Sequence, residues 1–423
     1  MDSNKPCQPT PPPAARIYVI KLDYFPPSII RQPPPPPAAH KEAKMKPEMI
    51  GGNNRSTRTY YLRSSKRKRK RLTDIESLPD EVLFEVLVRL PAQDIYNPAR
   101  LVCSKWYHMI HTHTFIYAHL QRSTYGLLFQ STNGDSFFMS VGESGRVEIS
   151  KKRYNLKNPL QTSCNGLLLE HERGSKYNIY VSNPATRQIF ALPPFVGYTK
   201  YSGIHCFGIA YAAASMEYKV VILAPVEGRK KICYILTIGV DNSWRSIGSE
   251  CESLQTKEFV STPLITEGFV HWYIRDTNEV LTLNIETEII TETSGPIHRV
   301  VNGNRQNMLL STGRYLSSLI PCGEFSWEVW EMKPKIDYRW RKVCDISLEA
   351  HKCNTFQQYR FNEHYYLMLT GWLKYLEVLV FRIYSQVLVF NLHTQEVFII
   401  DLLAPYAYGP VVHKNSLVWL GGC

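Results

Sequence analysis

The side chains that could carry out chemistry in this chain are histidines, cysteines and carboxylates, and their spacing matches no common catalytic or metal site. His111 and His113 are separated by one residue, but no cysteine or carboxylate is spaced to complete a zinc site with them. His351 and Cys353 form a second isolated pair. The glycine-rich nucleotide-binding motifs, the GxSxG nucleophile motif and the HExxH zinc motif are all missing. We therefore predict no catalytic residue, no metal ion, no cofactor and no enzymatic activity.

A more informative pattern is a run of apolar residues at helical spacing between residues 77 and 110. Ser77 can cap a first helix, Pro79 stands in its first turn, two acidic residues follow, and Pro91 ends it. So short a unit exposes more apolar surface than it can bury alone, so it needs a neighbour in the same chain or in another protein. The apolar positions are Leu78, Val82, Leu83, Val86, Leu87 and Leu90, followed in a second helix by Leu101, Val102, Trp106 and Ile110.

From about residue 124 the helical period disappears, and short runs of β-branched and aromatic residues alternate with clusters of Gly, Asn, Pro and Ser. The turns recur roughly forty to sixty residues apart, which is the range of propeller blades of the kelch or WD kind. The expected strands are Asn178–Ser182, Phe207–Tyr211, Tyr218–Leu223, Ile232–Ile238, Phe269–Ile274, Trp327–Met332 and Gln386–Leu392. The expected turns are Gly142–Arg146, Asn183–Thr186, Asp241–Ser243, Glu286-Thr287, Lys335–Tyr338 and His393-Thr394.

These patterns predict an α+β multi-domain chain, with a short helical domain at residues 74–122 and a large all-β domain at residues 124–423. One open sheet of this length would leave exposed edges, and radial closure removes most of them. We expect a β-propeller of about six blades, with a large β-sandwich as the alternative. His271 lies in an expected strand, where a hydrogen-bonded core histidine is the ordinary arrangement. The core between blades should contain Trp244, Trp272, Trp327, Trp340 and Trp419, of which Trp244 and Trp340 are each followed by Arg.

The formal net charge of +12 belongs to the first 73 residues, where sixteen Lys or Arg face four acids. The rest of the chain is neutral overall, which argues against a nucleic-acid-binding face on the folded part. Residues 1–73 are rich in proline and polar residues and are expected to be disordered, with Ile17–Phe25 as an apolar exception. A six-residue cationic run favours a nuclear import signal over a solvated linker, and it consists of Lys66, Arg67, Lys68, Arg69, Lys70 and Arg71.

The helical segment resembles the F-box. The matching residues, in order and correctly spaced, are Leu78-Pro79-Asp80-Glu81, Leu90-Pro91 and Val102-Cys103-Ser104-Lys105-Trp106. Asn97-Pro98 departs from the more helical, apolar pair usual in the family, and this leaves the start of the last helix open. Without the resemblance, the same residues describe a helical hairpin within a larger core.

The β region resembles the F-box-associated domain of plant F-box proteins. Each motif is short, and their order and spacing together make the match specific. With the F-box, the resemblance covers all but the N-terminal tail. The matching residues are Ser163-Cys164-Asn165-Gly166-Leu167-Leu168, Asn183-Pro184-Ala185-Thr186-Arg187, Leu192-Pro193, Phe207-Gly208-Ile209-Ala210-Tyr211, Tyr218-Lys219-Val220-Val221 and Gly268-Phe269-Val270-His271-Trp272.

The resemblance implies a non-catalytic receptor subunit of an SCF-type (Skp-cullin-F-box) ubiquitin ligase. Its F-box would bind a Skp-type adaptor and, through it, a cullin and a RING subunit, while the β domain would capture an unknown target protein. No membrane partner is expected, nucleic acid is not favoured, and the expected location is the nucleus, the cytoplasm or both. The residues expected to bind the adaptor are Leu78, Pro79, Val82, Leu83, Val86, Leu90, Val102 and Trp106.

Two other classes of function remain open from the sequence. The first is a nuclear nucleic-acid-binding or scaffolding protein that acts through its basic tail, since such a tail alone gives salt-sensitive, largely non-specific binding. The second is a propeller enzyme, which no sequence motif supports. Deleting residues 1–73 separates the first class from a ligase receptor, because the receptor would still bind its adaptor.

Overall fold

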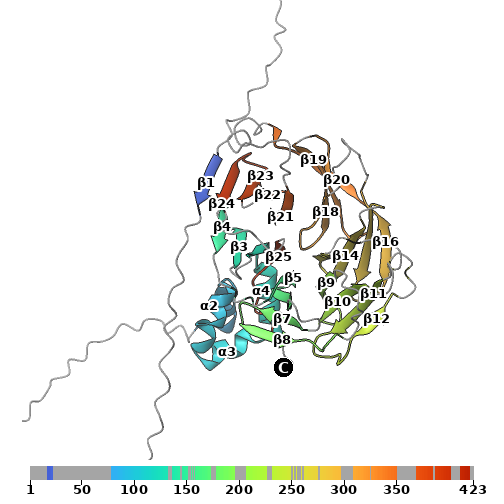
Figure 1. Cartoon of the computed structure of the whole chain (residues 1–423). Helices are drawn as coiled ribbons and strands as arrows, with labels where there is room; N and C mark the ends of the chain where they lie inside the picture. The colour runs from blue at the N-terminus through green and yellow to red at the C-terminus, as the bar shows by residue number, and fades with distance from the viewer. Residues whose placement is uncertain are drawn as a thin grey trace, which may run out of the picture. The chain divides into compact units, whose positions relative to one another are not determined.

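The computed structural model describes residues 17–21 and 78–419, the second range with breaks at residues 132–135, 143–144, 151–153, 155, 157, 173–177, 196–205, 226–230, 249–250, 252–253, 255–258, 260–261, 275–276, 297–307, 324, 350–367, 384–385 and 402–409. Helices occupy the segment from Asp80 to Arg122, and strands occupy the segment from Gly126 onward (Figure 1). The predicted order of a short helical part followed by a large all-β part is therefore confirmed.

The helical segment contains four α-helices and one 3-10 turn. The first helix carries two acidic residues in its first turn, as the sequence predicts. It ends before Pro91 with a tightened turn, in which the Leu90 N–H donates to the Leu87 carbonyl at 3.0 Å. The elements are α1 (Asp80–Leu87), α2 (Ala92–Tyr96), η2 (Ala99–Leu101), α3 (Ser104–Ile110) and α4 (His113–Arg122).

The predicted second helix is wrong in its first turn. Pro98 precedes the 3-10 turn η2, and Cys103 is fully extended, with φ −160° and ψ 169°, so α3 begins only at Ser104. Leu101 and Val102 therefore lie in a tight connection, where Pro98 has no N–H to donate to a preceding helical turn. Helix α4 was not predicted; it begins at the cap residue Thr112, whose hydroxyl oxygen accepts the Phe115 N–H at 3.2 Å.

Strands β2 to β25 form six antiparallel sheets of four strands, which we number as blades 1 to 6. Blade 1 contains β25 (Val411–His413), β2 (Gly126–Gln130), β3 (Ser136–Val141) and β4 (Val147–Ser150). Blade 2 contains β5 (Leu160–Cys164), β6 (Leu167–His171), β7 (Ile179–Asn183) and β8 (Gln188–Ala191). Blade 3 contains β9 (Cys206–Ala212), β10 (Glu217–Pro225), β11 (Lys231–Thr237) and β12 (Arg245–Ile247).

The remaining three blades follow the same pattern. Blade 4 contains β13 (Leu264–Thr266), β14 (Phe269–Ile274), β15 (Glu279–Asn284) and β16 (Ile290–Ser294). Blade 5 contains β17 (Met308–Ser311), β18 (Leu316–Pro321), β19 (Ser326–Met332) and β20 (Arg341–Ser347). Blade 6 contains β21 (Met368–Lys374), β22 (Val378–Ile383), β23 (Gln386–Asn391) and β24 (Val397–Asp401).

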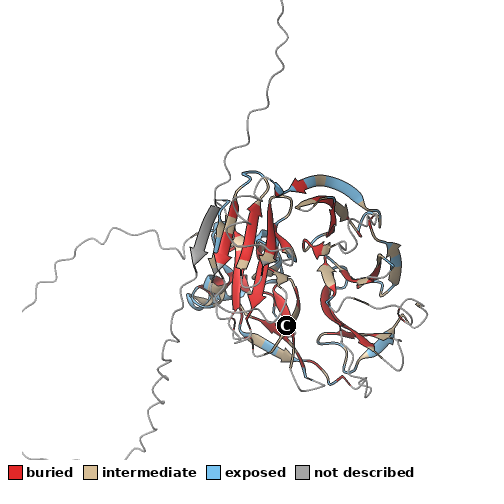
Figure 2. Cartoon of the chain, turned by 45° about the horizontal axis from the view of Figure 1, so that its top comes forward, coloured by how far each residue is buried: buried red, intermediate tan, exposed pale blue. Residues whose placement is uncertain are grey.

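The first strand of each blade is innermost, and successive inner strands contact one another around a ring from β25 through β5, β9, β13 and β17 to β21, which contacts β2 (Figure 1). The fold is a six-bladed β-propeller, so the predicted architecture and blade count are confirmed and a β-sandwich is excluded. Burial is concentrated where blades face each other, and the outer strands carry most of the exposed residues (Figure 2).

The ring is closed by the C-terminal strand. β25 pairs antiparallel with β2, with Gly126 opposite His413 and Leu128 opposite Val411. Blade 1 thus takes its inner strand from one end of the domain sequence and its other three strands from the opposite end. No local sequence signal predicts this pairing.

A strand also forms within the tail that we expected to be disordered. β1 (Ile17–Lys21) pairs in parallel with β24, the outer strand of blade 6, with Ile17 opposite Val397 and Lys21 opposite Asp401. The prediction of disorder therefore fails for these five residues, because the outer edge of blade 6 offers free backbone groups for pairing. The rest of residues 1–73 lies outside the described residues.

The six predicted turns all occupy the same place in a blade, namely the connection between its third strand and its outer strand. Several use the left-handed backbone conformation typical of tight turns, with φ of 56° at Arg187, 59° at Glu288 and 56° at Gln395. One predicted turn in each blade explains why the repeat gave the blade count correctly.

The two Trp-Arg pairs also have equivalent places. Trp244 and Trp340 each lie just before the outer strand of their blade, β12 and β20. The indole N–H of Trp244 donates to the Pro193 carbonyl at 2.8 Å, and that of Trp340 donates to the Ser294 carbonyl at 3.1 Å. Both acceptors follow or end the outer strand of the preceding blade, so each indole fastens one blade to the next.

The predicted core residues divide into two groups. Trp272 and Trp327 are buried between blades, as expected, and Trp244 and Trp340 are partly buried. Trp419 is exposed, so its assignment to the core is wrong; its ring packs against Tyr96 and His111 of the helical segment.

His271 confirms the expected arrangement of a core histidine. It is buried in β14, and its two ring nitrogens hydrogen-bond the hydroxyls of Thr266 at 2.8 Å and Thr282 at 2.9 Å. Burial lowers its pKa to about 3, so the ring is neutral near pH 7.

Candidate functional site: the propeller channel and the exposed helical surface

A cavity of about 580 Å³ lies where the inner strands meet, and residues from all six blades line it. Helix α4 contributes Tyr117, Leu120 and Gln121 to the same lining. The size is in the range of about 300–1,000 Å³ that is usual for ligand sites. The cavity is therefore a candidate binding site made jointly by the propeller and the last helix of the helical segment.

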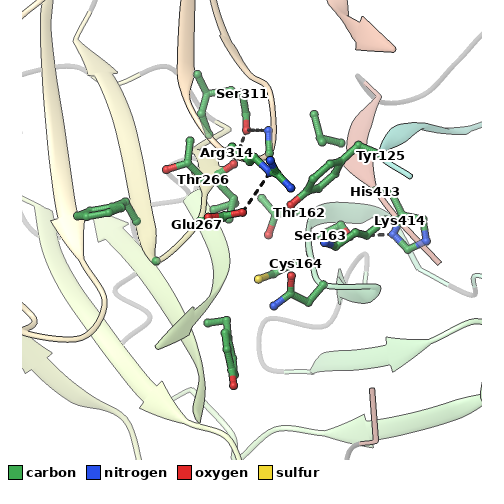
Figure 3. A pocket seen from close by; sticks show the side chains of 18 of the residues that line it. Tyr125, Thr162, Ser163, Cys164, Thr266, Glu267, Ser311, Arg314, His413 and Lys414 are labelled. Carbon is green, nitrogen blue, oxygen red and sulfur yellow. Dashed lines mark hydrogen bonds and ion pairs between the residues drawn. The ribbon is translucent and has the colours of Figure 1, made fainter. Parts of the chain in front are cut away.

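Part of the lining is a charged cluster on blades 4 and 5. Glu267 pairs with two cations, accepting from the Lys335 Nζ at 3.0 Å and lying 3.4 Å from the Arg314 Nε. Figure 3 shows the Arg314 and Glu267 side chains directed toward each other in the cavity. A second lining carboxylate, Glu286, accepts the backbone N–H groups of Ala214 and Ser215 at 3.0 and 3.1 Å. Both carboxylates of this lining are thus already compensated.

The third lining cation, Lys414, is different. It follows β25 and is only 6% exposed. Its Nζ lies 4.5 Å from the centroid of the Tyr125 ring, and no carboxylate among the described residues pairs with it. Burial is the main cause that lowers the pKa of this amine. Lys414 is therefore a desolvated cation at the cavity wall with an aromatic face as its compensation.

Beside Lys414, the Ser163 hydroxyl and the His413 Nδ1 form a hydrogen bond of 2.8 Å (Figure 3). Burial lowers the pKa of His413 to about 4, so this ring too is neutral near pH 7. Among the described residues no carboxylate orients the ring, as one does in a Ser-His-Asp triad. Burial also raises the pKa of the neighbouring Cys164 thiol to about 12, so it stays protonated. These groups add hydrogen-bonding capacity to the wall without adding charge.

The segment that carries Lys414 is fixed by hydrogen bonds to blade 2. The buried Asn183 amide donates to the carbonyls of Ser416 at 3.2 Å and Val418 at 2.7 Å, and the Ser416 hydroxyl donates to the Asn165 carbonyl at 2.6 Å. Gly166, at φ 87°, leaves room for this approach, since a Cβ there would lie 2.2 Å from the Ser416 Oγ. We interpreted Asn165-Gly166 and Asn183-Pro184 as turn formers; they also position the C-terminal segment.

The helical segment presents a second candidate surface. Five apolar residues of this segment are exposed, and we call them the exposed apolar set: Val82 (46% exposed), Val86 (48%), Leu90, Leu101 (70%) and Val102 (52%). Val82 and Val86 are four residues apart and therefore share one face of α1. Leu101 and Val102 lie next to one another in the connection before α3.

The eight predicted adaptor-binding residues fall into two groups. Val82, Val86, Leu90 and Val102 belong to the exposed apolar set, Pro79 is also exposed, and Leu78 is half-buried. Leu83 and Trp106 are buried, so they do not present their side chains to a partner. Contact of any of the eight with an adaptor remains a prediction.

Helix α4 belongs to both parts of the molecule. Leu120 lies in the buried cluster that contains Leu167 and Leu169 of β6. On the other side, the Phe115 ring meets Phe84 edge to face, with centroids 5.2 Å apart, and the His119 Nε2–H donates to the Leu90 carbonyl at 3.0 Å. Helix α4 therefore packs against both the propeller and α1, while the side chains of the exposed apolar set remain exposed.

Sequence reasoning missed four residues that come from blades 1, 4 and 5 and have no common spacing, namely Lys414, Tyr125, Glu267 and Arg314. It also missed the exposure of Leu101. The predicted import signal at residues 66–71 and the pair at residues 351 and 353 lie outside the described residues. Within the described residues, no group of three His, Cys, Asp or Glu is placed to hold a metal ion, and no helix is long and apolar enough to span a bilayer.

The chain is thus a two-part protein, in which a short helical unit with exposed apolar residues is joined through helix α4 to a six-bladed propeller. Comparison with known families is more specific. The F-box-like family model matches residues 75–123, and the model of the F-box associated beta propeller domain matches residues 116–397. The chain belongs to the F-box associated beta propeller domain family, and its helical segment is an F-box.

Several proteins of Arabidopsis thaliana are similar to this chain. F-box protein At5g49610 is 24% identical over 289 residues, covering 65% of this chain and 80% of that protein. Putative F-box only protein 15 is 26% identical over 230 residues, covering 51% and 57%. F-box protein CPR1 is 27% identical over 197 residues, covering 42% and 47%, so this match spans about half of that relative.

Proposed function

We propose that this protein is the target-recognition subunit of an SCF-type ubiquitin ligase. Its F-box would bind a Skp-type adaptor that links it to a cullin and a RING subunit, and the propeller would hold the target. The ligase then works by proximity, because holding target and ubiquitin donor together raises their effective concentration. In this role the chain contributes binding and positioning, and the chemistry belongs to its partners.

The observation that carries the proposal is the exposed apolar set. Five large apolar side chains in a segment of about twenty residues remain exposed, although Leu120 of the neighbouring helix α4 is buried against the propeller. An uncovered apolar cluster of this kind is typical of a protein-binding surface. Burying it would contribute about 25 cal/mol per Å² before the ordering cost of association.

The test is co-purification of a Skp-type adaptor with the full chain. The double variant Val86→Asp/Val102→Asp places charges on two exposed positions of the F-box. We expect it to weaken adaptor binding by about a hundredfold or more, because a charge would be desolvated at the centre of an apolar interface. Both side chains are about half exposed, so the change should not unfold the chain.

Ile189→Asp is the matched control. Ile189 is an equally exposed apolar residue, but it lies on the outer strand β8 of the propeller. This variant should bind the adaptor as the wild type does. Wild-type binding by the F-box double variant, or equal loss in both variants, would contradict the proposed role.

We also propose that the cationic run at residues 66–71 directs the protein to the nucleus. Its support is the sequence alone, six consecutive Lys or Arg in a proline-rich, polar tail. Replacing all six by Ala in a fluorescently tagged full chain should shift it toward the cytoplasm. An unchanged distribution would contradict this assignment without affecting the proposed adaptor binding.

A further inference from the structure

The charges that line the propeller channel do not balance. Among the described lining residues, three cations face two carboxylates. Glu267 is shared by Arg314 and Lys335, and Glu286 is held by backbone N–H groups. Among the described residues, Lys414 has an aromatic ring and no directly paired carboxylate, and the charge of Glu267 acts on it without an ion-pair contact. The lining thus has an excess of one positive charge, located at its most buried cation.

A buried ammonium group without an anion is costly, because its lost hydration is only partly replaced by the face of Tyr125. The hydrogen bonds from Asn183 and Ser416 hold the backbone of the segment that carries it, so the side chain cannot easily withdraw. An anion that enters the cavity would offset this cost directly. The burial that lowers the pKa of Lys414 is the same feature that would strengthen such a charge pair.

The lining also indicates which kind of anion fits. One uncompensated lysine matches a single negative charge, whereas a doubly charged phosphate would meet the carboxylate of Glu267 in the same cavity. The guanidinium of Arg314, which could otherwise grip a phosphate with two parallel hydrogen bonds, is already engaged by Glu267. The hydroxyl of Ser163, beside Lys414, supplies a neutral hydrogen-bonding group.

We propose that the propeller channel binds a singly charged carboxylate, seated against Lys414. The volume of about 580 Å³ admits more than the carboxylate itself, so the ligand is either an acidic segment of a protein or a free organic acid. If the receptor role proposed above holds, the acidic segment belongs to the target, and only this assignment rests on that role. The channel would then select targets by an acidic side chain or a chain terminus.

The first experiment compares two probes that differ in one charge. N-acetyl-glutamate α-amide carries one side-chain carboxylate, and N-acetyl-glutamine amide is its neutral counterpart of the same shape. Ligand-observed NMR with the full chain at low salt should show at least about tenfold tighter binding of the charged probe, the effect of about 1.4 kcal/mol from one charge pair. Inorganic phosphate should bind more weakly than the carboxylate. Equal binding of the two amides, tighter binding of phosphate, or no saturable binding at millimolar concentrations would overturn the proposal.

The variant Lys414→Met tests whether the charged probe binds next to Lys414. It removes the charge and keeps an unbranched apolar side chain, and it should abolish the preference for the charged probe. Lys231→Met is the matched control, since Lys231 also lies over an aromatic ring, that of Phe259, but does not line the cavity. Retained preference in Lys414→Met would overturn the proposal. If this variant fails to fold, the comparison of probes on the wild type still decides.

Selection of a random peptide library on the full chain distinguishes the two sources. Enrichment of Asp and Glu on the wild type, lost on Lys414→Met, assigns the carboxylate to a protein segment. Binding of the glutamate probe without such enrichment assigns it to a free acid. The receptor role is tested separately, because Val86→Asp/Val102→Asp should lose the adaptor and still bind the charged probe.

Discussion

The exposed apolar set of the F-box and the propeller channel are the two candidate binding surfaces of this protein, and they are built in opposite ways. The first is a set of exposed aliphatic side chains on helix α1 and in the connections that follow it. The second is a cavity, partly open to solvent, whose wall carries a buried lysine, hydroxyls and compensated carboxylates. The first suits a partner that covers area, and the second suits a partner that supplies one particular charge.

This difference has a consequence for specificity. Apolar area is nondirectional, so the same surface can serve every member of a family with one common adaptor. A buried cation with fixed neighbours binds ligands without a negative charge poorly, because such a ligand leaves the cation without an ionic partner. The exposed apolar set therefore suits an adaptor that many proteins share. The propeller channel suits a ligand selected for its charge.

The largest expected effect comes from truncating two predicted adaptor-binding residues that precede the exposed apolar set in the sequence. Leu78→Ala/Pro79→Ala truncates the start of α1, where Pro79 is exposed and Leu78 half-buried. We expect about a hundredfold or greater loss of adaptor co-purification, as for central apolar anchors of an interface. The propeller should remain folded by circular dichroism, and Lys414→Met should bind the adaptor normally. Unchanged adaptor binding by the double variant would contradict the assignment of the F-box surface to the adaptor.

The second effect concerns the channel wall. Asn183→Ala removes the amide that holds the Ser416 and Val418 carbonyls, leaving buried groups unpaired. We expect a loss of about 2–4 kcal/mol in the free energy of unfolding, measured with urea. Asn178→Ala, at an exposed asparagine before β7, should cost less than about 1 kcal/mol. A similar small change in both variants would show that the C-terminal segment is held in some other way.

The third effect is a pH dependence of stability, to which two buried histidines of the propeller should contribute most. Folded His271 and His413 have pKa values of about 3 and about 4, below the ordinary value of about 6.5. The unfolded chain therefore binds more protons in this window, and stability present above pH 6.5 is lost as the pH falls. We expect a loss of about 2–3 kcal/mol for each histidine between about pH 6.5 and 4.5.

Urea unfolding at several pH values checks this expectation. Replacing either histidine by Gln should make the slope clearly smaller, and the rest of the slope includes His119 and His171, whose pKa values burial also lowers. Hydrogen bonds from Arg245 lower the pKa of the Glu288 carboxyl to about 2. The contribution of Glu288 to stability is therefore lost only when the pH falls below the ordinary carboxyl pKa of about 4.5. If the histidine variants leave the slope of unfolding free energy against pH unchanged, other titratable groups must cause the loss of stability.

The smallest effect is a difference in salt dependence. Raising the ionic strength from low salt to about 0.15 M shortens the screening length to about 8 Å. We expect binding of the glutamate probe to weaken a few-fold, since one charge pair in a partly enclosed site is only partly screened. Adaptor binding through the exposed apolar set should hardly change. The reverse order of salt sensitivity would mean that the two surfaces have been assigned the wrong kinds of partner.

The elements of the fold could be predicted from local signals, and the channel could not. The strand Phe269–Ile274 is found as predicted, and the six turns fall at one position per blade, because alternation and turn residues are short-range features. Helix α4 escaped prediction because His, Thr and Gln interrupt its few apolar residues and weaken the helical pattern. The neighbourhood of Lys414 and Tyr125 joins residues nearly three hundred positions apart, and only closure of the ring brings them together.

The pairing of β2 with β25 also constrains how the protein is made. At about 5–20 residues per second, roughly fifteen to sixty seconds of synthesis separate the two strands, during which the inner edge of blade 1 has no partner. A nascent chain in that interval presents open β-edges to its surroundings and depends on protection from aggregation. A stop codon shortly before residue 411 would therefore do more than trim a terminus: blade 1 would lack its inner strand β25, and the ring could not close.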